Sequence, residues 1–210
     1  MQIKTLNVGL FQTNCYLVSD EKYVMVIDPG DHYSYIVSEL PGEVTHIVIT
    51  HYHPDHIGAL KELKESFPKA LVITGKNEIT TTEFVVDVAK QALGPWFPRT
   101  QFSKPGFSAV QPDLTVGEKD SVCGFEVLET PGHTPGSICL LNKKEGCIFT
   151  GDTLFQGSFG RTDFTGGDYD SIMFSVKKLM ALDNNIRVYP GHNEFTTIGN
   201  EKSVYQCFSL

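Results

Sequence analysis

The stretch "ITHYHPDHIGAL" constrains this chain more than any other, because it places four metal- or proton-binding side chains within six residues: His51, His53, Asp55 and His56. The apolar, β-branched run "VTHIVIT" leads directly into it and predicts a buried strand. Side chains alternate along an extended strand, so His51 and His53 point the same way. Pro54 suits the first turn of a helix, which would turn Asp55 and His56 toward the same space.

Three further strands end in a similar manner, with a polar side chain beside a glycine at the turn. His133 lies in "TPGHTPGS", Asp152 in "FTGDT" and His192 in "YPGHN". Each taken alone would be an ordinary loop residue, but the histidine-rich segment makes all three candidate metal ligands. Imidazoles with a few carboxylates form the ligand set of zinc, and also of iron or manganese. Seven such groups exceed one tetrahedral ion and favour two ions with one bridging carboxylate, for which Asp152 is the candidate.

Two histidines are expected to stay outside this set. His46 lies five residues before His51 on the same strand, and this odd spacing places it on the opposite face. His32 follows "DPGD" in a loop, where we expect it to be solvated.

The order of apolar runs predicts two packed β-sheets. Strand-like runs in the first half are "QIKTLNVG", "TNCYLVSD", "YVMVIDPG" and "ALVIT", and those in the second are "FEVLETPG", "SICLLN", "GCIFTGDT" and "IRVYPGH". Helices are predicted over 34–40, 54–67, 76–93 and 168–182. We expect one α/β domain over residues 1–210, in which two similar halves form sheets that helices cover.

Charge and composition exclude several classes of partner. Lys and Arg number 17 against 25 Asp and Glu, and a net charge of −8 repels phosphate backbones, so no nucleic-acid partner is expected. No apolar run approaches the roughly 20 residues of a membrane span, and the N-terminus has no signal-peptide pattern. The five cysteines form no C-x-x-C pair, which indicates free thiols in a reducing compartment. We expect a cytoplasmic protein with no membrane partner.

Residues 76–106 interrupt the regular pattern. After the predicted helix, "GPWFPRTQFSKPGF" holds three prolines, two glycines, three phenylalanines and the single tryptophan. A long loop in a compact domain is more often functional than idle. This one either shapes a pocket or packs under a surface helix.

The motifs "THYHPDH", "GHTPGS", "GDTLF" and "PGH" resemble those of the metallo-β-lactamase superfamily, in the same order and from about Asp28 to Lys202. The resemblance implies a four-layer αββα sandwich of two mixed sheets with a dinuclear site at one edge. The strings "GDTLFQGSFGRTDFTGGDYDS" and "YPGHNEFTTIGNEK" are similar to hydroxyacylglutathione hydrolases (glyoxalase II) and their short bacterial relatives. That family implies hydrolysis of a thioester, usually S-D-lactoylglutathione, by a metal-bridging hydroxide.

The resemblance also assigns roles to individual residues. One ion would be held by His51, His53 and His133, the other by Asp55, His56 and His192, with Asp152 as the bridge. Asp55 and Asp152 would thereby be catalytic. Asp28, in "IDPG", matches an aspartate that supports the ligands from behind, and Arg161 stands where longer members carry a lysine that helps to bind glutathione. Zinc is the expected metal, with iron or manganese as alternatives.

Two departures bear on glutathione. Full-length glyoxalase II enzymes carry a C-terminal helical domain whose basic residues grip glutathione, whereas eighteen residues follow His192 here. Those enzymes have a tyrosine two residues after the last histidine ligand, where this chain has Glu194. We therefore expect a broad range of small-molecule thioesters and a high KM for S-D-lactoylglutathione, with Arg161 and the loop around Trp96 as the remaining contacts.

Other functions fit the same motifs less well. Persulfide dioxygenases share the fold and the string "GRTDF", and would hold one iron through His51, His133 and Asp152. A phosphodiesterase or nuclease uses the same edge of this fold, but the negative net charge opposes it. A non-enzymatic scaffold would have lost ligands, and all seven are present.

Overall fold

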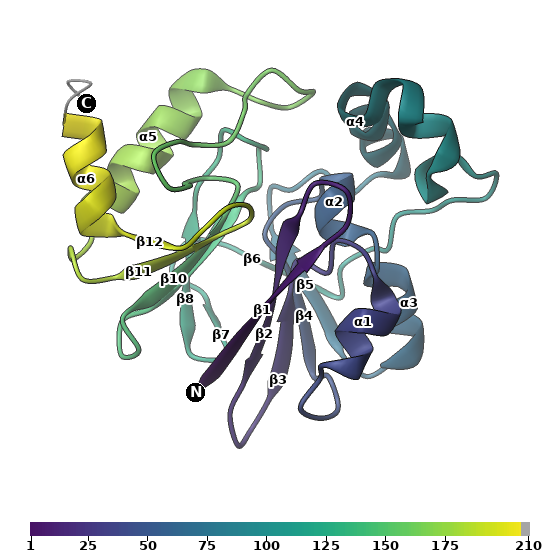
Figure 1. Cartoon of the computed structure of the whole chain (residues 1–210), viewed down its shortest axis with the longest axis horizontal. Helices are drawn as coiled ribbons and strands as arrows, with labels where there is room; N and C mark the ends of the chain where they lie inside the picture. Colours follow the sequence, from purple (N-terminus) through teal and green to yellow (C-terminus); the bar gives the residue numbers. More distant parts are fainter. Residues whose placement is uncertain (207–210) are drawn as a thin grey trace.

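The computed structural model describes residues 1–206 and contains two six-stranded β-sheets that face each other (Figure 1). The strands of the first sheet lie in chain order: β1 (Gln2–Val8), β2 (Thr13–Ser19), β3 (Val24–Ile27), β4 (His46–Ile49), β5 (Leu71–Gly75) and β6 (Leu114–Val116). β1, β2 and β3 are antiparallel neighbours, and β3 to β6 are parallel. The parallel strands therefore end at one common edge of the sheet.

The second sheet is also mixed, with the strand order β12-β11-β10-β9-β8-β7. Its strands are β7 (Ser121–Val122), β8 (Phe125–Glu129), β9 (Ile138–Asn142), β10 (Cys147–Gly151), β11 (Arg187–Pro190) and β12 (Thr196–Thr197). β10 and β11 pair in parallel, and the other neighbours pair antiparallel. The parallel pair brings the ends of β10 and β11 to the same edge.

Helices cover the outer face of each sheet (Figure 1). They are α1 (Tyr33–Ser38), α2 (Pro54–Ile57), α3 (Leu60–Ser66), α4 (Thr82–Leu93), α5 (Tyr169–Met180) and α6 (Ile198–Gln206), with 3₁₀ turns η1 (Gly94–Arg99) and η2 (Gln101–Ser103). Helices α1 and α3 lie on the side of the first sheet, and α5 and α6 on the side of the second. The predicted four-layer αββα sandwich is confirmed.

Strand β4 is buried on both faces, which explains its unbroken apolar sequence. Its Val48 points between the sheets, into a cluster that includes Phe125 and Phe149 of the second sheet. Its Ile47 and Ile49 point the other way, into the cluster under the helices. A strand that alternates between two apolar layers needs no polar face. The rigid strand then delivers His51 and His53 to the edge where the sheets meet.

The helix predicted over 54–67 is broken in the structure. The backbone N–H of Ala59 donates to the carbonyl of Pro29 at 2.9 Å, so it leaves the helical ladder. Gly58 permits this approach, because a Cβ there would lie 2.0 Å from the carbonyl oxygen of Gly30. The short helix α2 is thus pinned to the loop after β3, which carries Asp28.

The helix predicted over 76–93 begins later, at Thr82, because Thr81 caps it. The Thr81 hydroxyl accepts the backbone N–H of Phe84 at 3.2 Å, the usual arrangement of a threonine N-cap. The six residues before it form turns and coil instead.

The thiols of Cys15, Cys123, Cys139 and Cys147 are free, and all but Cys123 are buried. Cys207 lies outside the described residues. Within residues 1–206, no helix has the length and apolar character needed to cross a membrane.

Candidate metal centre

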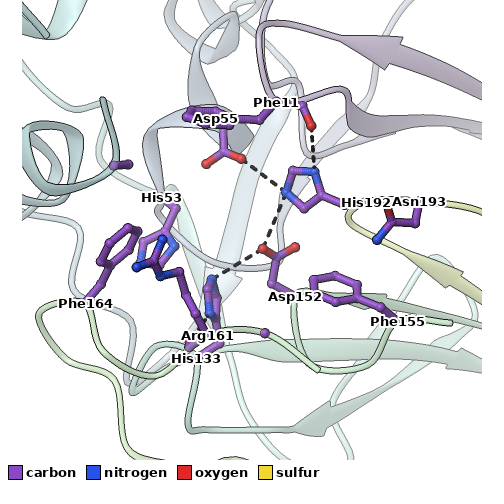
Figure 2. A pocket seen from close by; sticks show the side chains of 12 residues that line it. Phe11, His53, Asp55, His133, Asp152, Phe155, Arg161, Phe164, His192 and Asn193 are labelled. Carbon is purple, nitrogen blue, oxygen red and sulfur yellow. Dashed lines mark hydrogen bonds and ion pairs between the residues drawn. The ribbon is translucent and has the colours of Figure 1, made fainter. Parts of the chain in front are cut away.

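The seven residues singled out by sequence come together at the edge shared by the two sheets. His51 and His53 follow β4, and Asp55 and His56 lie in the first turn of α2. The other three come from the second half of the chain: His133 follows β8, Asp152 follows β10 and His192 follows β11. Figure 2 shows five of the seven around one pocket.

Their potential ligand atoms fall into overlapping groups whose members lie within 4.8 Å of one another. A group of His51, His56 and Asp152 shares one member with each of the two others: His51, His53 and His133, and Asp55, His56 and His192. These are the same two sets that the resemblance assigned to two separate ions. Groups this compact, drawn from distant parts of the chain, match the spacing that a pair of metal ions requires.

Asp152 lies between the two groups. Its Oδ1 is 3.4 Å from Nε2 of His56, and its Oδ2 is 3.4 Å from Nε2 of His133 and 3.5 Å from Nε2 of His192. One carboxylate therefore reaches both groups (Figure 2). This is the position that a bridging ligand requires.

The pocket floor carries buried lone pairs that the described protein atoms leave unsatisfied. A buried polar atom without a partner is costly, so such a set indicates a missing ligand. The atoms are Nε2 of His51, His53, His56 and His133, and Oδ1 of Asp152. Nitrogen and oxygen donors converging in this way fit divalent transition-metal ions.

The opposite ring nitrogens of several histidines are held by the protein. Nδ1 of His133 donates to the carbonyl of Arg161 at 2.7 Å, and Nδ1 of His192 donates to the carbonyl of Phe11 at 3.1 Å. Such bonds fix the tautomer and turn Nε2 toward the site. The orientation of both imidazoles is therefore set before any ion binds.

Asp28 lies behind the ligand groups, next to His56. It is 1% exposed, and its backbone has φ of 51°, a left-handed conformation that is uncommon for a non-glycine residue. Its two oxygens accept the backbone N–H and the hydroxyl of Thr50 at 2.7 and 2.6 Å. Oδ2 also lies 3.0 Å from Nδ1 of His56. The buried carboxylate thus orients His56 and ties the loop after β3 to the end of β4.

Burial lowers the pKa of the three histidines of the first group. The pKa of His53 falls to about 3, and those of His51 and His133 also fall below their ordinary values. All three imidazoles are therefore neutral near pH 7 and offer lone pairs, the form in which histidine binds metals.

The second group has the opposite electrostatic character. Burial opposes charge on His192, but the carboxylate of Asp152 outweighs it and raises the pKa of His192 to about 10. Burial likewise opposes charge on Asp55, but the adjacent His56 lowers the pKa of Asp55 to about 2. The carboxylates are thus anionic at neutral pH and supply the negative charge that favours a dication.

A pocket of about 430 Å³ opens above these groups (Figure 2). Its apolar wall comes from three separate segments: Phe11 from the β1–β2 loop, Ala92 from α4, and Phe155 and Phe164 from the connection between β10 and α5. A small organic molecule with an apolar portion can therefore lie against the wall with its reacting group over the histidines.

Arg161, the expected substrate contact, lines this pocket, and its guanidinium already binds another residue. Nε and Nη2 donate to the two carboxylate oxygens of Asp163, both at 2.7 Å. The guanidinium also stacks 3.6 Å from the centre of the Phe164 ring. A substrate carboxylate would have to compete with Asp163 for this side chain.

Glu78 is a residue of the site that the sequence did not reveal. Its Oε1 accepts the backbone N–H of Tyr52, between His51 and His53, at 3.4 Å. Its Oε2 accepts the hydroxyl of Thr134, next to His133, at 2.5 Å. One carboxyl group thereby links the two segments that carry the three histidines of the first group. Burial raises the pKa of Glu78 to about 7.

Replacing Glu78 with glutamine is expected to change how stability depends on pH. The folded protein holds the Glu78 proton more tightly than the unfolded chain, with a pKa of about 7 against an ordinary 4.5. Its contribution is therefore complete below about pH 4.5 and is lost as the pH rises through about 7. Urea unfolding of both metal-free proteins, from about pH 4 to 8, should show the wild type losing stability relative to the variant. A constant difference would contradict this.

The remaining sequence predictions near the site have clear outcomes. His46 is half-buried, and its ring contacts Thr45 instead of the ligand groups. His32 is exposed in its loop. Glu194 is also exposed and does not line the pocket, whereas the neighbouring Asn193 does.

Comparison with known proteins agrees with this geometry. Residues 8–192 match the family model described as the metallo-beta-lactamase superfamily. The chain is 37% identical to hydroxyacylglutathione hydrolase GloC of Haemophilus influenzae, over 96% of this chain and 95% of that protein.

Two solved structures give the same picture. The chain superposes on TTHA1623, crystallised in a di-iron-bound form, with a TM-score of 0.78 and 31% identity, covering 96% of this chain and 98% of that one. It superposes on ETHE1 from Myxococcus xanthus with a TM-score of 0.73 and 30% identity, covering 96% and 82%. With its buried cluster of histidines and aspartates, the chain belongs to the metallo-β-lactamase superfamily of metal-dependent enzymes.

Proposed function

We propose that this protein is a thioester hydrolase of the hydroxyacylglutathione hydrolase type. The observation that carries the proposal is the pair of ligand groups joined by Asp152 beneath an apolar-walled pocket. The likeness to GloC along nearly the whole of both chains supports the substrate class.

Seven side chains would hold two divalent ions, zinc by preference. The neutral imidazoles of His51, His53 and His133 would hold the first ion. Asp55, His56 and His192 would hold the second ion, and Asp152 would bind both. When bound, two such ions lower the pKa of a shared water toward about 7 and polarise a carbonyl oxygen.

The side chains of the pocket then position the reactants. The Oδ2 atom of Asp55 lies 3.2 Å from Nε2 of His192 and accepts the hydroxyl of Thr13 at 3.2 Å, so its carboxylate is held in place at the pocket wall. From there it can accept a hydrogen bond from an attacking water. Phe11 and Phe164 cover the apolar part of the substrate and exclude bulk water.

The leaving group makes modest demands on the protein. A free thiol has a pKa of about 8.5, so a thiolate departs without a dedicated acid. This fits a pocket whose titratable groups are all engaged as candidate metal ligands, apart from the exposed Arg161. It favours a thioester over an amide, whose amine must be protonated to leave.

A persulfide dioxygenase is the second candidate, because the di-iron form of TTHA1623 shows that a structure similar to this one binds iron. Three of the seven residues, His51, His133 and Asp152, would suffice for one iron. The other four would then be unexplained, which is why hydrolysis is the better proposal.

The zinc-loaded protein is expected to cleave lactoyl thioesters. The variant His133→Asn is expected to lower kcat by at least about 10²-fold, because even residues that only support metal ligands change metal affinity or activity by 10- to 100-fold. Thiol release can be followed with a chromogenic thiol reagent. The matched control is His32→Asn, an exposed histidine with φ of 54° that asparagine tolerates. A protein that cleaves no thioester but consumes oxygen with glutathione persulfide would establish the dioxygenase instead.

A further inference from the structure

A second cavity, of about 360 Å³, adjoins the metal pocket. Phe11 and Asp55 line both cavities, so a molecule over the metal groups can extend past them. The far wall of the second cavity is built by residues 93, 99, 100, 101 and 102, from the end of α4 through η1 and η2. The aromatic and proline-rich segment of the sequence therefore shapes a cavity, in addition to packing Phe102 into the core.

The two arginines beside these cavities differ in what they already bind. Arg161 donates two hydrogen bonds to Asp163 and lies in the metal pocket. Figure 2 places Arg161 and Phe164 on the side of that pocket away from Phe11 and Asp55. A carboxylate arriving at Arg161 would meet a charge that is already neutralised.

Arg99 lines the second cavity and forms no ion pair with any carboxylate among residues 1–206. Its guanidinium is held 4.9 Å from the ring centre of Trp96, a side chain that is 58% exposed. Stacking on an aromatic ring orients a guanidinium while leaving its N–H donors free at the edge. The guanidinium of Arg99 is thus held in one orientation, with N–H donors available to an anionic group.

The second cavity also carries negative charge. Asp31 and Glu62 line it together with Arg99, whereas the amide N–H of Gln101 is committed to the carbonyl of Gly58 at 2.7 Å. Leu93 and Phe102 provide an apolar surface between the charges. A lining with both signs suits a ligand with both an ammonium and a carboxylate, and it repels a ligand with several phosphates.

We propose that the second cavity binds the charged end of the thiol carrier, with Arg99 as the residue that selects carboxylate-bearing, amino-acid-like carriers. The inference rests on the proposed thioester hydrolysis and adds the location of carrier recognition. Asp31 or Glu62 would receive the carrier's ammonium group. The predicted contact at Arg161 becomes secondary.

The test uses one acyl group on three carriers: lactoyl thioesters of neutral N-acetylcysteamine, of glutathione and of coenzyme A. Arg99→Gln is expected to raise KM for the glutathione thioester about fivefold, the worth of a partly exposed ion pair, with KM for the neutral thioester unchanged. Arg161→Gln should raise it by a smaller factor. The matched control is Arg187→Gln, an exposed arginine that lines a different cavity. In the wild type, KM should be lower for the glutathione than for the coenzyme A thioester.

Calorimetric binding of S-methylglutathione, which cannot be hydrolysed, separates this proposal from the proposed function. Its Kd should rise in Arg99→Gln by the same factor as KM. If no thioester is cleaved but this Kd responds to Arg99→Gln, the hydrolase proposal fails and the carrier site stands. Two results would show that the carrier site is wrong while the neutral thioester is still cleaved. One is that Arg161→Gln weakens the binding of S-methylglutathione as much as Arg99→Gln does. The other is that the coenzyme A thioester binds more tightly than the other two.

Discussion

Asp152→Ala is expected to lower metal content from near two ions per chain to below one, and to reduce thioester hydrolysis by about 10³-fold or more. The carboxylate lies 3.4 to 3.5 Å from Nε2 of His56, His133 and His192, so its removal affects both ligand groups. It also removes a negative charge that attracts a dication to either group. Loss of a single electrostatic contributor in a dry site already costs about 10²- to 10³-fold.

Metal analysis of protein purified with excess zinc, together with thiol-release kinetics, measures both effects. The control is Asp170→Ala, because Asp170 is an exposed aspartate outside the pocket and should keep two ions and full activity. Circular dichroism should show both variants folded. Retention of two ions by Asp152→Ala would mean that this carboxylate is not a bridge.

The convergence of the seven residues could be predicted because it depends on local geometry. Strand β4 carries the chain to the edge of the sheet, where His51 and His53 follow it, and Pro54 starts the helix that turns Asp55 inward. The hydrophobic runs before Asp152 and His192 are strands β10 and β11, whose parallel pairing sends both residues to the same edge. The sequence pattern alone therefore predicts which residues follow the ends of the strands at one edge of a sheet.

Contacts between distant turns could not be predicted in this way. Glu78 was assigned to a helix, and nothing in its spacing indicated that it would accept hydrogen bonds from Tyr52 and Thr134. The pairing of Arg161 with Asp163 could not be predicted from the sequence either, because residues two positions apart meet only in a particular loop conformation. The local sequence pattern carries no information on such contacts. These contacts nevertheless decide how firmly the ligand side chains are held and which charged groups remain unpaired.

Removal of metal by a chelator is expected to abolish hydrolysis and to lower the Tm by roughly 10 °C or more. A ligand that binds only the folded state stabilises it by about 4 kcal/mol when present at 1,000 times its Kd. Each kcal/mol shifts the Tm of a domain of this size by about 2–4 °C. The buried, unpaired lone pairs of His51, His53 and His133 make this gain large, because an ion satisfies them all.

Scanning calorimetry at one pH and protein concentration, with chelator and then with excess zinc, measures the shift and its reversal. His133→Asn should show a smaller shift, because the first group loses one of its three imidazoles. Asp170→Ala, which changes an exposed aspartate outside the pocket, should respond to zinc as the wild type does. A Tm that is the same with chelator and with zinc would show that these buried atoms are satisfied in some other way, and that the pocket floor is not a metal centre.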